Sequence, residues 1–201
     1  MVPKISRLEL RDNNDLLSTE QAMLTDFKGR ALPHLEFQQR TNWEWLALAQ
    51  HFGMATRLLD WTTNPLAALW FAIEYPSESR AAVWIFHALP SDYVADTEKG
   101  SPFSTDLTRV FRPTHLTRRI VAQDGWFTVH KFIKKSDRFV PLQNIARYQK
   151  CLSYIVVPPD NFAQLRAELN RCGMNSASLY ADLPGLSRHI EWKFSPLKDE
   201  K

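Results

Sequence analysis

The stretch HFGMATRLLDWTTNP, residues 51–65, joins two apolar blocks of the chain. Within fifteen positions it holds a His, an Arg, an Asp, a Trp and two adjacent Thr residues. It also has a glycine near one end and an Asn-Pro pair at the other, and these are signals for the end of one helix and the start of the next. We therefore expect a buried strand or an extended connector, RLLDW, between two central helices. Arg57 and Asp60 then lie close to the protein core.

The segments on both sides of this stretch have helical periodicity. Before it, Thr41 and Glu44 form a capping-box pattern. The apolar stripe of that helix is expected at Trp45, Leu48, Ala49 and Phe52, with Gly53 after its end. After it, Asn64 and Pro65 begin a helix that is apolar nearly all round, as in a central helix. One face of this second helix comprises Leu66, Leu69, Trp70 and Ile73.

The rest of the chain alternates helix-like and strand-like segments. Ser18 and Gln21 indicate the start of a helix that Pro33 ends. Strands are expected from Ala81, buried on both faces, and over CLSYIVVPP. Between them, a short helix or turn broken at Asp124-Gly125 precedes a strand that contains Phe127 and Val129. A surface helix over residues 159–173 and one last short helix complete the chain, the former with an inward face of Phe162, Leu165, Leu169 and Cys172.

These patterns predict a mixed α+β fold. Its helix-rich N-terminal half packs on a small, mostly buried sheet, and residues 1–201 form a single domain. A chain of this length buries roughly two thirds to three quarters of its unfolded surface. Cys151 and Cys172 are too few for a disulfide framework, and we expect both to be small buried hydrophobes. The sequence contains no signal-peptide pattern and no membrane-spanning run, so we expect a cytoplasmic protein with no membrane partner.

Several kinds of chemistry are poorly supported by the sequence. The six His residues are scattered and form no metal-ligand spacing, so no metal site is predicted. Six glycines in the whole chain do not make a phosphate-binding glycine loop, and no nucleophile-elbow pattern is present. The formal charge of +3 gives no strong indication of nucleic-acid binding. One local basic cluster comprises Arg109, Arg112, Arg118 and Arg119.

The polar residues of the opening stretch allow two interpretations. In the structural one, which residue chemistry favours, Arg57 and Asp60 pair across a bend and fix the turn. In the functional one, Arg57 binds a phosphate or carboxylate and the helix start at Asn64 adds oriented amides. His51 is then an acid/base or a hydrogen-bond donor. Thr56 and Thr62 face the same cleft.

Three blocks of the sequence resemble the FRG domain family. The longest, Trp43 to Glu74, resembles the family pattern W-L-x-L-x-Q-H-x-G-x-P-T-R-L-L-D-W-T-x-N-P-L-x-A-L-x-F-A. A second, Arg118 to His130, is similar to the family's R-I-x-x-Q-x-G-x-F element. A third, Gly173 to Trp192, is similar to its closing G-I-x-x-x-x-L-F-P-D-L-D-G-L-A segment.

The chain departs from the family pattern at four places. Ala55 stands at a usual Pro, and Ala181 and Pro184 replace the usual Pro and Asp. The Phe-Arg-Gly element that names the family is not found, and we expect the chain to begin just after it. If that Arg serves function, the protein lacks one wall of its site.

The resemblance implies an uncharacterised bacterial or phage domain, for which two hypotheses are kept. The first is an ADP-ribosyltransferase-like, NAD-using enzyme that acts in phage defence or a related conflict, by weak analogy between the naming motif and the phosphate-gripping Arg of such enzymes. Gln123 and His51 are then the candidate catalytic residues, although a loop amide is the commoner role for Gln123. The candidate ligand-binding residues are Thr56, Arg57, Asp60, Trp61, Thr62, Arg119, Trp126 and Phe127.

The second hypothesis is a non-catalytic module that binds a protein or nucleic-acid partner. Seven Trp and twelve Phe residues build a large core and still leave aromatic surface for a partner. The basic residues from Arg109 to Arg119 then meet a nucleic-acid backbone or an acidic protein face. The salt dependence of binding separates the two hypotheses, because a phosphate-backbone contact weakens steeply with salt.

Overall fold

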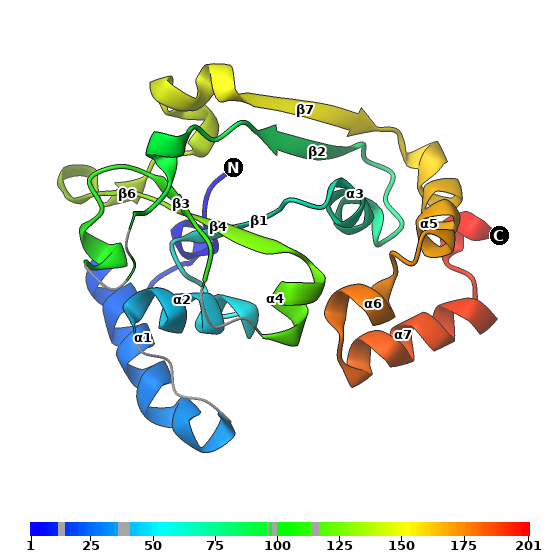
Figure 1. Ribbon diagram of the computed structural model, residues 1–201, viewed down its shortest axis with the longest axis horizontal. Coiled ribbons are helices and arrows are strands. Elements are labelled where there is room, and N and C mark those ends of the chain that lie inside the picture. Colours follow the sequence, from blue (N-terminus) through cyan, green and yellow to red (C-terminus); the bar gives the residue numbers. More distant parts are fainter. Residues whose placement is uncertain (12–14, 36–40, 96, 98–99, 114–116) are drawn as a thin grey trace. The chain divides into compact units, whose positions relative to one another are not determined.

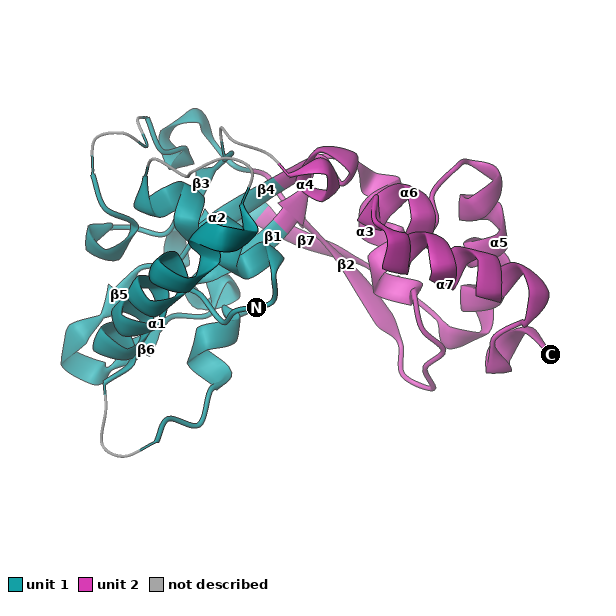
Figure 2. Ribbon diagram, turned by 90° about the horizontal axis from the view of Figure 1, so that it is seen from below, with its two compact units in different colours: residues 1–60, 88–115, 126–151 teal, residues 61–87, 116–125, 152–201 magenta. Residues whose placement is uncertain are grey.

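The computed structural model describes residues 1–11, 15–35, 41–95, 97, 100–113 and 117–201. The chain forms two compact units, each built from three segments (Figure 2). Unit 1 comprises residues 1–60, 88–115 and 126–151, and unit 2 comprises residues 61–87, 116–125 and 152–201. The expected mixed α+β class is confirmed, with several small antiparallel sheets in place of a single small sheet.

The described residues of unit 1 include the α-helices α1 (Leu16–Ala31) and α2 (Asn42–His51) and most of a three-stranded sheet (Figure 1). The sheet has the order β1-β4-β3, with β1 (Leu58–Thr62), β3 (Arg109–Phe111) and β4 (Gly125–Val129). β3 and β4 are antiparallel with Arg109 opposite Val129. A separate two-stranded sheet pairs β5 (Phe132–Ile133) with β6 (Arg138–Phe139).

The caps of the first two helices follow from their sequences. The predicted capping box of α2 is confirmed, because the Thr41 hydroxyl accepts from the backbone of Glu44 and the Glu44 side chain accepts from the backbone of Thr41. Gly53 follows the helix end with φ +86°, a conformation that glycine adopts without a steric penalty. The expected start of α1 at Ser18 was wrong. Asp15 is the N-cap and accepts from the Ser18 amide, so the helix begins three residues earlier.

Unit 2 is a helical cluster beside a two-stranded antiparallel ribbon (Figure 1). The ribbon pairs β2 (Ala81–Phe86) with β7 (Leu152–Val157), and Trp84 lies opposite Tyr154. Its helices are α3 (Pro65–Ile73), α4 (Arg118–Ala122), α5 (Phe162–Arg171), α6 (Ser176–Tyr180) and α7 (Leu183–Phe194). Its core comprises Ala67, Trp70, Ile73, Val157, Phe162, Leu169 and Leu179.

Short 3-10 helices connect these elements. They are η1 (Lys4–Arg7), η2 (Leu32–His34), η3 (Pro90–Asp92), η4 (Pro102–Ser104), η5 (Lys134–Ser136), η6 (Leu142–Asn144), η7 (Ala146–Cys151), η8 (Pro159–Asn161) and η9 (Lys198–Glu200). Among the described residues, no helix is long and apolar enough to cross a bilayer.

Several predicted burial patterns were wrong. β2 is only half-buried along most of its length, whereas the sequence predicted a strand buried on both faces. The buried face of α3 is Ala67, Trp70 and Ile73, while Leu66 is exposed. Phe52 and Cys172 are also exposed, since each lies at the C-cap of its helix, past the last inward turn, and Cys151 is only half-buried. The closing segment forms two helices, α6 and α7, instead of one.

Candidate functional site

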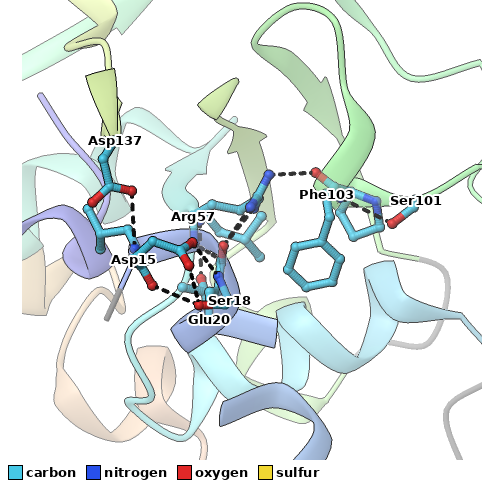
Figure 3. A network of polar contacts seen from close by, with 11 residues as sticks. Asp15, Ser18, Glu20, Arg57, Ser101, Phe103 and Asp137 are labelled. Atoms are coloured by element: carbon cyan, nitrogen blue, oxygen red, sulfur yellow. Dashed lines mark hydrogen bonds and ion pairs between the residues drawn. The ribbon is translucent and has the colours of Figure 1, made fainter. Parts of the chain in front are cut away.

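Arg57 is the centre of a buried ion pair in unit 1 (Figure 3). Its side chain and that of Glu20 on α1 are both fully buried, and Nη2 of Arg57 lies 2.7 Å from Oε2 of Glu20. Glu20 also accepts hydrogen bonds from Nε and from the backbone amide of Arg57. The remaining guanidinium nitrogen, Nη1, donates to the carbonyl oxygen of Pro102 at 3.0 Å. Burial raises the pKa of Glu20, and the charge of Arg57 opposes that shift.

The predicted pairing of Arg57 with Asp60 was therefore wrong, because the partner of Arg57 is Glu20. Arg57 points into the unit, whereas Asp60 is exposed and accepts from Nε2 of Gln50 at 2.8 Å. The structural role predicted for Arg57 nevertheless has a strong physical basis. A ligand that used this guanidinium would have to displace Glu20 and leave its charge buried without a partner.

The other candidate residues of unit 1 also take part in packing. Thr56 is fully buried, and its hydroxyl donates to Gln50 and accepts from the Leu58 amide. His51 is half-buried at the end of α2, with its ring centroid 4.8 Å from that of Phe52. Phe127 is buried and stacks on Phe111 at 5.5 Å. Trp126 is half-buried, with the ring of Tyr93 and the guanidinium of Arg112 nearby.

In unit 2, Thr62 and Gln123 join the three blocks that resemble the FRG family. The Thr62 hydroxyl donates to the backbone oxygen of Gln123 at 2.6 Å, which ties the first block to the second. Nε2 of Gln123 donates to the backbone oxygen of Leu179 at 3.1 Å, which ties the second block to the third. Thr63 adds contacts with Asp124, which has a left-handed φ of +47° and ends α4. The side chain of Gln123 thus holds α4 against α6.

Tyr180, the last residue of α6, is where the three blocks meet. Its hydroxyl lies 3.0 Å from each carboxylate oxygen of Glu74, the C-cap of α3. The guanidinium carbons of Arg119 and Arg188 lie 4.4 and 4.1 Å from the centroid of its ring. We call Glu74, Arg119, Tyr180 and Arg188 the Tyr180 cluster. Two cations and one carboxylate therefore surround a single half-buried ring.

The electrostatics of the Tyr180 cluster favour an anion. Burial raises the pKa of Glu74, and the opposing contributions come from Tyr180, Tyr75, Arg188 and Arg119. Burial and the charge of Glu74 raise the pKa of Tyr180 to about 12, so its hydroxyl is a neutral donor at pH 7. Within the described part of the chain, the Arg119 guanidinium contacts the Tyr180 ring and has no hydrogen-bond acceptor.

A cavity of about 380 Å³ adjoins the Tyr180 cluster and shares Glu74 and Arg188 with it. Helices α3, α5 and α7 and the segment after α7 supply most of its walls. Its aromatic walls are Trp70, Tyr75 and Trp192, and its cationic ones are Arg166, Arg188 and Lys198. Arg166 is already paired with Asp199 and Glu200. No group of three or more His, Cys, Asp or Glu side chains able to hold a metal occurs in the described ranges.

Of the candidate residues proposed from the sequence, Arg119 alone belongs to the Tyr180 cluster. Thr62 and Gln123 position it, and Trp61 packs on Phe86 elsewhere in unit 2. The other six lie in unit 1. Sequence reasoning missed Glu74, Tyr180, Arg188 and the cavity. A signal existed, because all three residues lie within the first and third family-like blocks.

Comparison with known proteins supports the resemblance over part of the chain. Residues 1–81 match the model of the FRG domain family, and this range contains the whole first block. The second and third blocks lie outside the matched range. No curated protein and no solved structure matches the chain.

Proposed function

We propose that this protein, whose residues 1–81 match the FRG domain, binds a phosphate-bearing nucleotide at the Tyr180 cluster. NAD is the first ligand to test, and ADP-ribosyl transfer in bacterial or phage conflict is the activity that we assign to it. The observation that carries the proposal is the Arg119 guanidinium, held against the Tyr180 ring with its N–H groups unused within the described residues. Planar guanidinium donors match the oxygen pairs of a phosphate.

The arrangement supports a division of roles among the three charged residues. Arg119 and Arg188 bind the phosphates, because their charges exceed that of the single carboxylate beside them. Glu74 accepts hydrogen bonds from the ribose hydroxyls and stabilises the positive charge that develops on the sugar. In such a transfer the bond between C1′ and the nicotinamide nitrogen breaks, and nicotinamide leaves with the electron pair. The acceptor's nucleophile bonds to C1′ and loses its proton.

A thermal melt with and without excess NAD tests this function. A ligand at 100 times its dissociation constant stabilises the folded protein by ~2.7 kcal/mol, which corresponds to roughly 5–10 °C for a chain of this size. Arg119→Met is expected to abolish the shift. Arg118→Met is the matched control, because Arg118 is the exposed neighbour on the same helix and its removal is expected to leave the shift intact. No shift with the unmodified protein, or equal shifts in both variants, would overturn the proposal.

A second candidate function, an interaction module, is favoured by the surface of α7. Its exposed apolar side chains recur every three to four residues, as in a helix that packs against a partner. They are Leu183, Leu186, Ile190 and Phe194. A second copy of the chain is the first partner to test. We expect the solution mass to rise with concentration and to stay monomeric in Ile190→Lys, and a concentration-independent mass of the unmodified chain would count against self-association.

A further inference from the structure

The cavity beside the Tyr180 cluster has aromatic side chains among its walls. Tyr75 and Trp192 line it, and Arg188 lies on both the cavity and the Tyr180 cluster. A ligand that fills the cavity can therefore carry a phosphate that binds Arg188. Stacking on an aromatic side chain is a common way in which proteins bind a nucleobase, and it depends little on which base is bound.

His189 brings a polar side chain to this cavity. It follows Arg188 on α7, lines the cavity, and lies with its ring centroid 6.0 Å from that of Trp192. Its Nδ1 is buried and has no hydrogen-bond partner among the described residues. A buried polar atom without a partner is uncommon, and a ligand is one of the few explanations for it.

The size of the cavity limits what it can hold. Ligand pockets usually measure about 300–1,000 Å³, and this one is near the lower end at about 380 Å³. A dinucleotide contains two bases, two sugars and two phosphates. We therefore expect the cavity to hold one nucleoside, a base with its sugar, and not a whole dinucleotide.

We infer that the cavity is a nucleoside subsite, which makes the chain specific for one nucleoside monophosphate unit, either free or as half of a dinucleotide. The base stacks against an aromatic ring of the cavity wall, Tyr75 or Trp192, and hydrogen-bonds to Nδ1 of His189, while the 5′-phosphate of the nucleotide lies at Arg188. This inference rests on the proposed phosphate site at the Tyr180 cluster. It adds that the phosphate-bearing ligand contains a base, which the cavity binds.

Calorimetric titrations with inorganic phosphate, ribose 5-phosphate, AMP and nicotinamide mononucleotide test the subsite. Stacking of one base contributes about 1–3 kcal/mol, so at least one of the two nucleotides should bind roughly 5- to 150-fold more tightly than ribose 5-phosphate. Nucleotides that bind no better than ribose 5-phosphate would overturn the subsite and leave the phosphate site standing. Absence of binding by all four probes would overturn both proposals.

Variants of His189 test the assigned hydrogen bond. His189→Leu should weaken nucleotide binding about 5- to 10-fold, the value of one hydrogen bond, and leave ribose 5-phosphate unchanged. His189→Asn keeps a polar atom near the Nδ1 position and should retain most of the affinity. His87→Leu is the control, because His87 is an exposed histidine of the same unit. Equal nucleotide affinity in His189→Leu and His87→Leu would contradict the role of His189.

Discussion

Removal of the Glu20 carboxylate is the sharpest test of how the opening stretch is held. Glu20→Ala leaves the guanidinium of Arg57 fully buried without its counter-ion and removes three hydrogen bonds (Figure 3). Loss of one partner of a buried ion pair costs about 3–5 kcal/mol. We expect the free energy of unfolding to fall by about that amount. Equilibrium unfolding in urea, followed by tryptophan fluorescence, measures the change.

The same helix offers a matched control. Asp26 on α1 also pairs with an arginine, Arg30, at 2.8 Å, but both side chains are more than half exposed. Because water screens exposed pairs, Asp26→Ala should cost less than about 1 kcal/mol. Equal costs for Glu20→Ala and Asp26→Ala would refute the reasoning. A double replacement, Glu20→Met with Arg57→Met, removes both charges and should recover most of the lost stability.

Three further predictions concern the rest of the fold. Burial lowers the pKa of His130 from 6.5 to about 4. As the pH decreases, the unfolded chain is therefore protonated at this histidine before the folded one is. The free energy of unfolding should decrease as the pH is lowered from 6.5, by about 3 kcal/mol at pH 4. His130→Gln should flatten this part of the urea-derived stability profile, and an unchanged profile would contradict the shift. Gly185→Ala places a Cβ 2.6 Å from the carbonyl oxygen of Ser176 and should cost about 1–3 kcal/mol, whereas Gly29→Ala in α1 meets no atom within 4 Å and should stabilise by about 0.5–1 kcal/mol; melting temperatures that move in the same direction would contradict the pair. Gln123→Ala leaves the Leu179 carbonyl without this donor and should lower the free energy of unfolding by about 1–3 kcal/mol. An unchanged urea midpoint would show that Gln123 does not hold α4 against α6.

The local structure of the opening stretch follows from nearby residues. Thr41 and Glu44 cap α2, and Asn64 caps α3 with Pro65 behind it, as their spacing predicts. Each of these bonds joins residues two to four positions apart, so the sequence contains the whole interaction. Of the two alternatives predicted for RLLDW, the structure has the strand, over Leu58–Thr62, and it is only partly buried.

The partner of Arg57 could not be deduced in the same way. Asp60 is three residues away and has the right charge, but Glu20 is 37 residues away and occupies a buried position on another helix. Sequence spacing alone favours a nearby carboxylate as the partner of Arg57. In the folded protein the guanidinium is buried, so its partner is a carboxylate that is buried beside it. Only the packing of α1 determines that choice.

The candidate site shows the same division. The sequence by itself identified Arg119, Thr62 and Gln123 as polar residues of family-like blocks, and it gave each block a plausible helix or strand. The Tyr180 cluster joins residues 74, 119, 180 and 188, which come from four different helices or helix ends. Such a cluster has no periodicity or spacing in the sequence, because its members are brought together by long-range packing. The sequence therefore determined the helix caps and several of the elements of this protein, and the tertiary structure alone decided which charges meet.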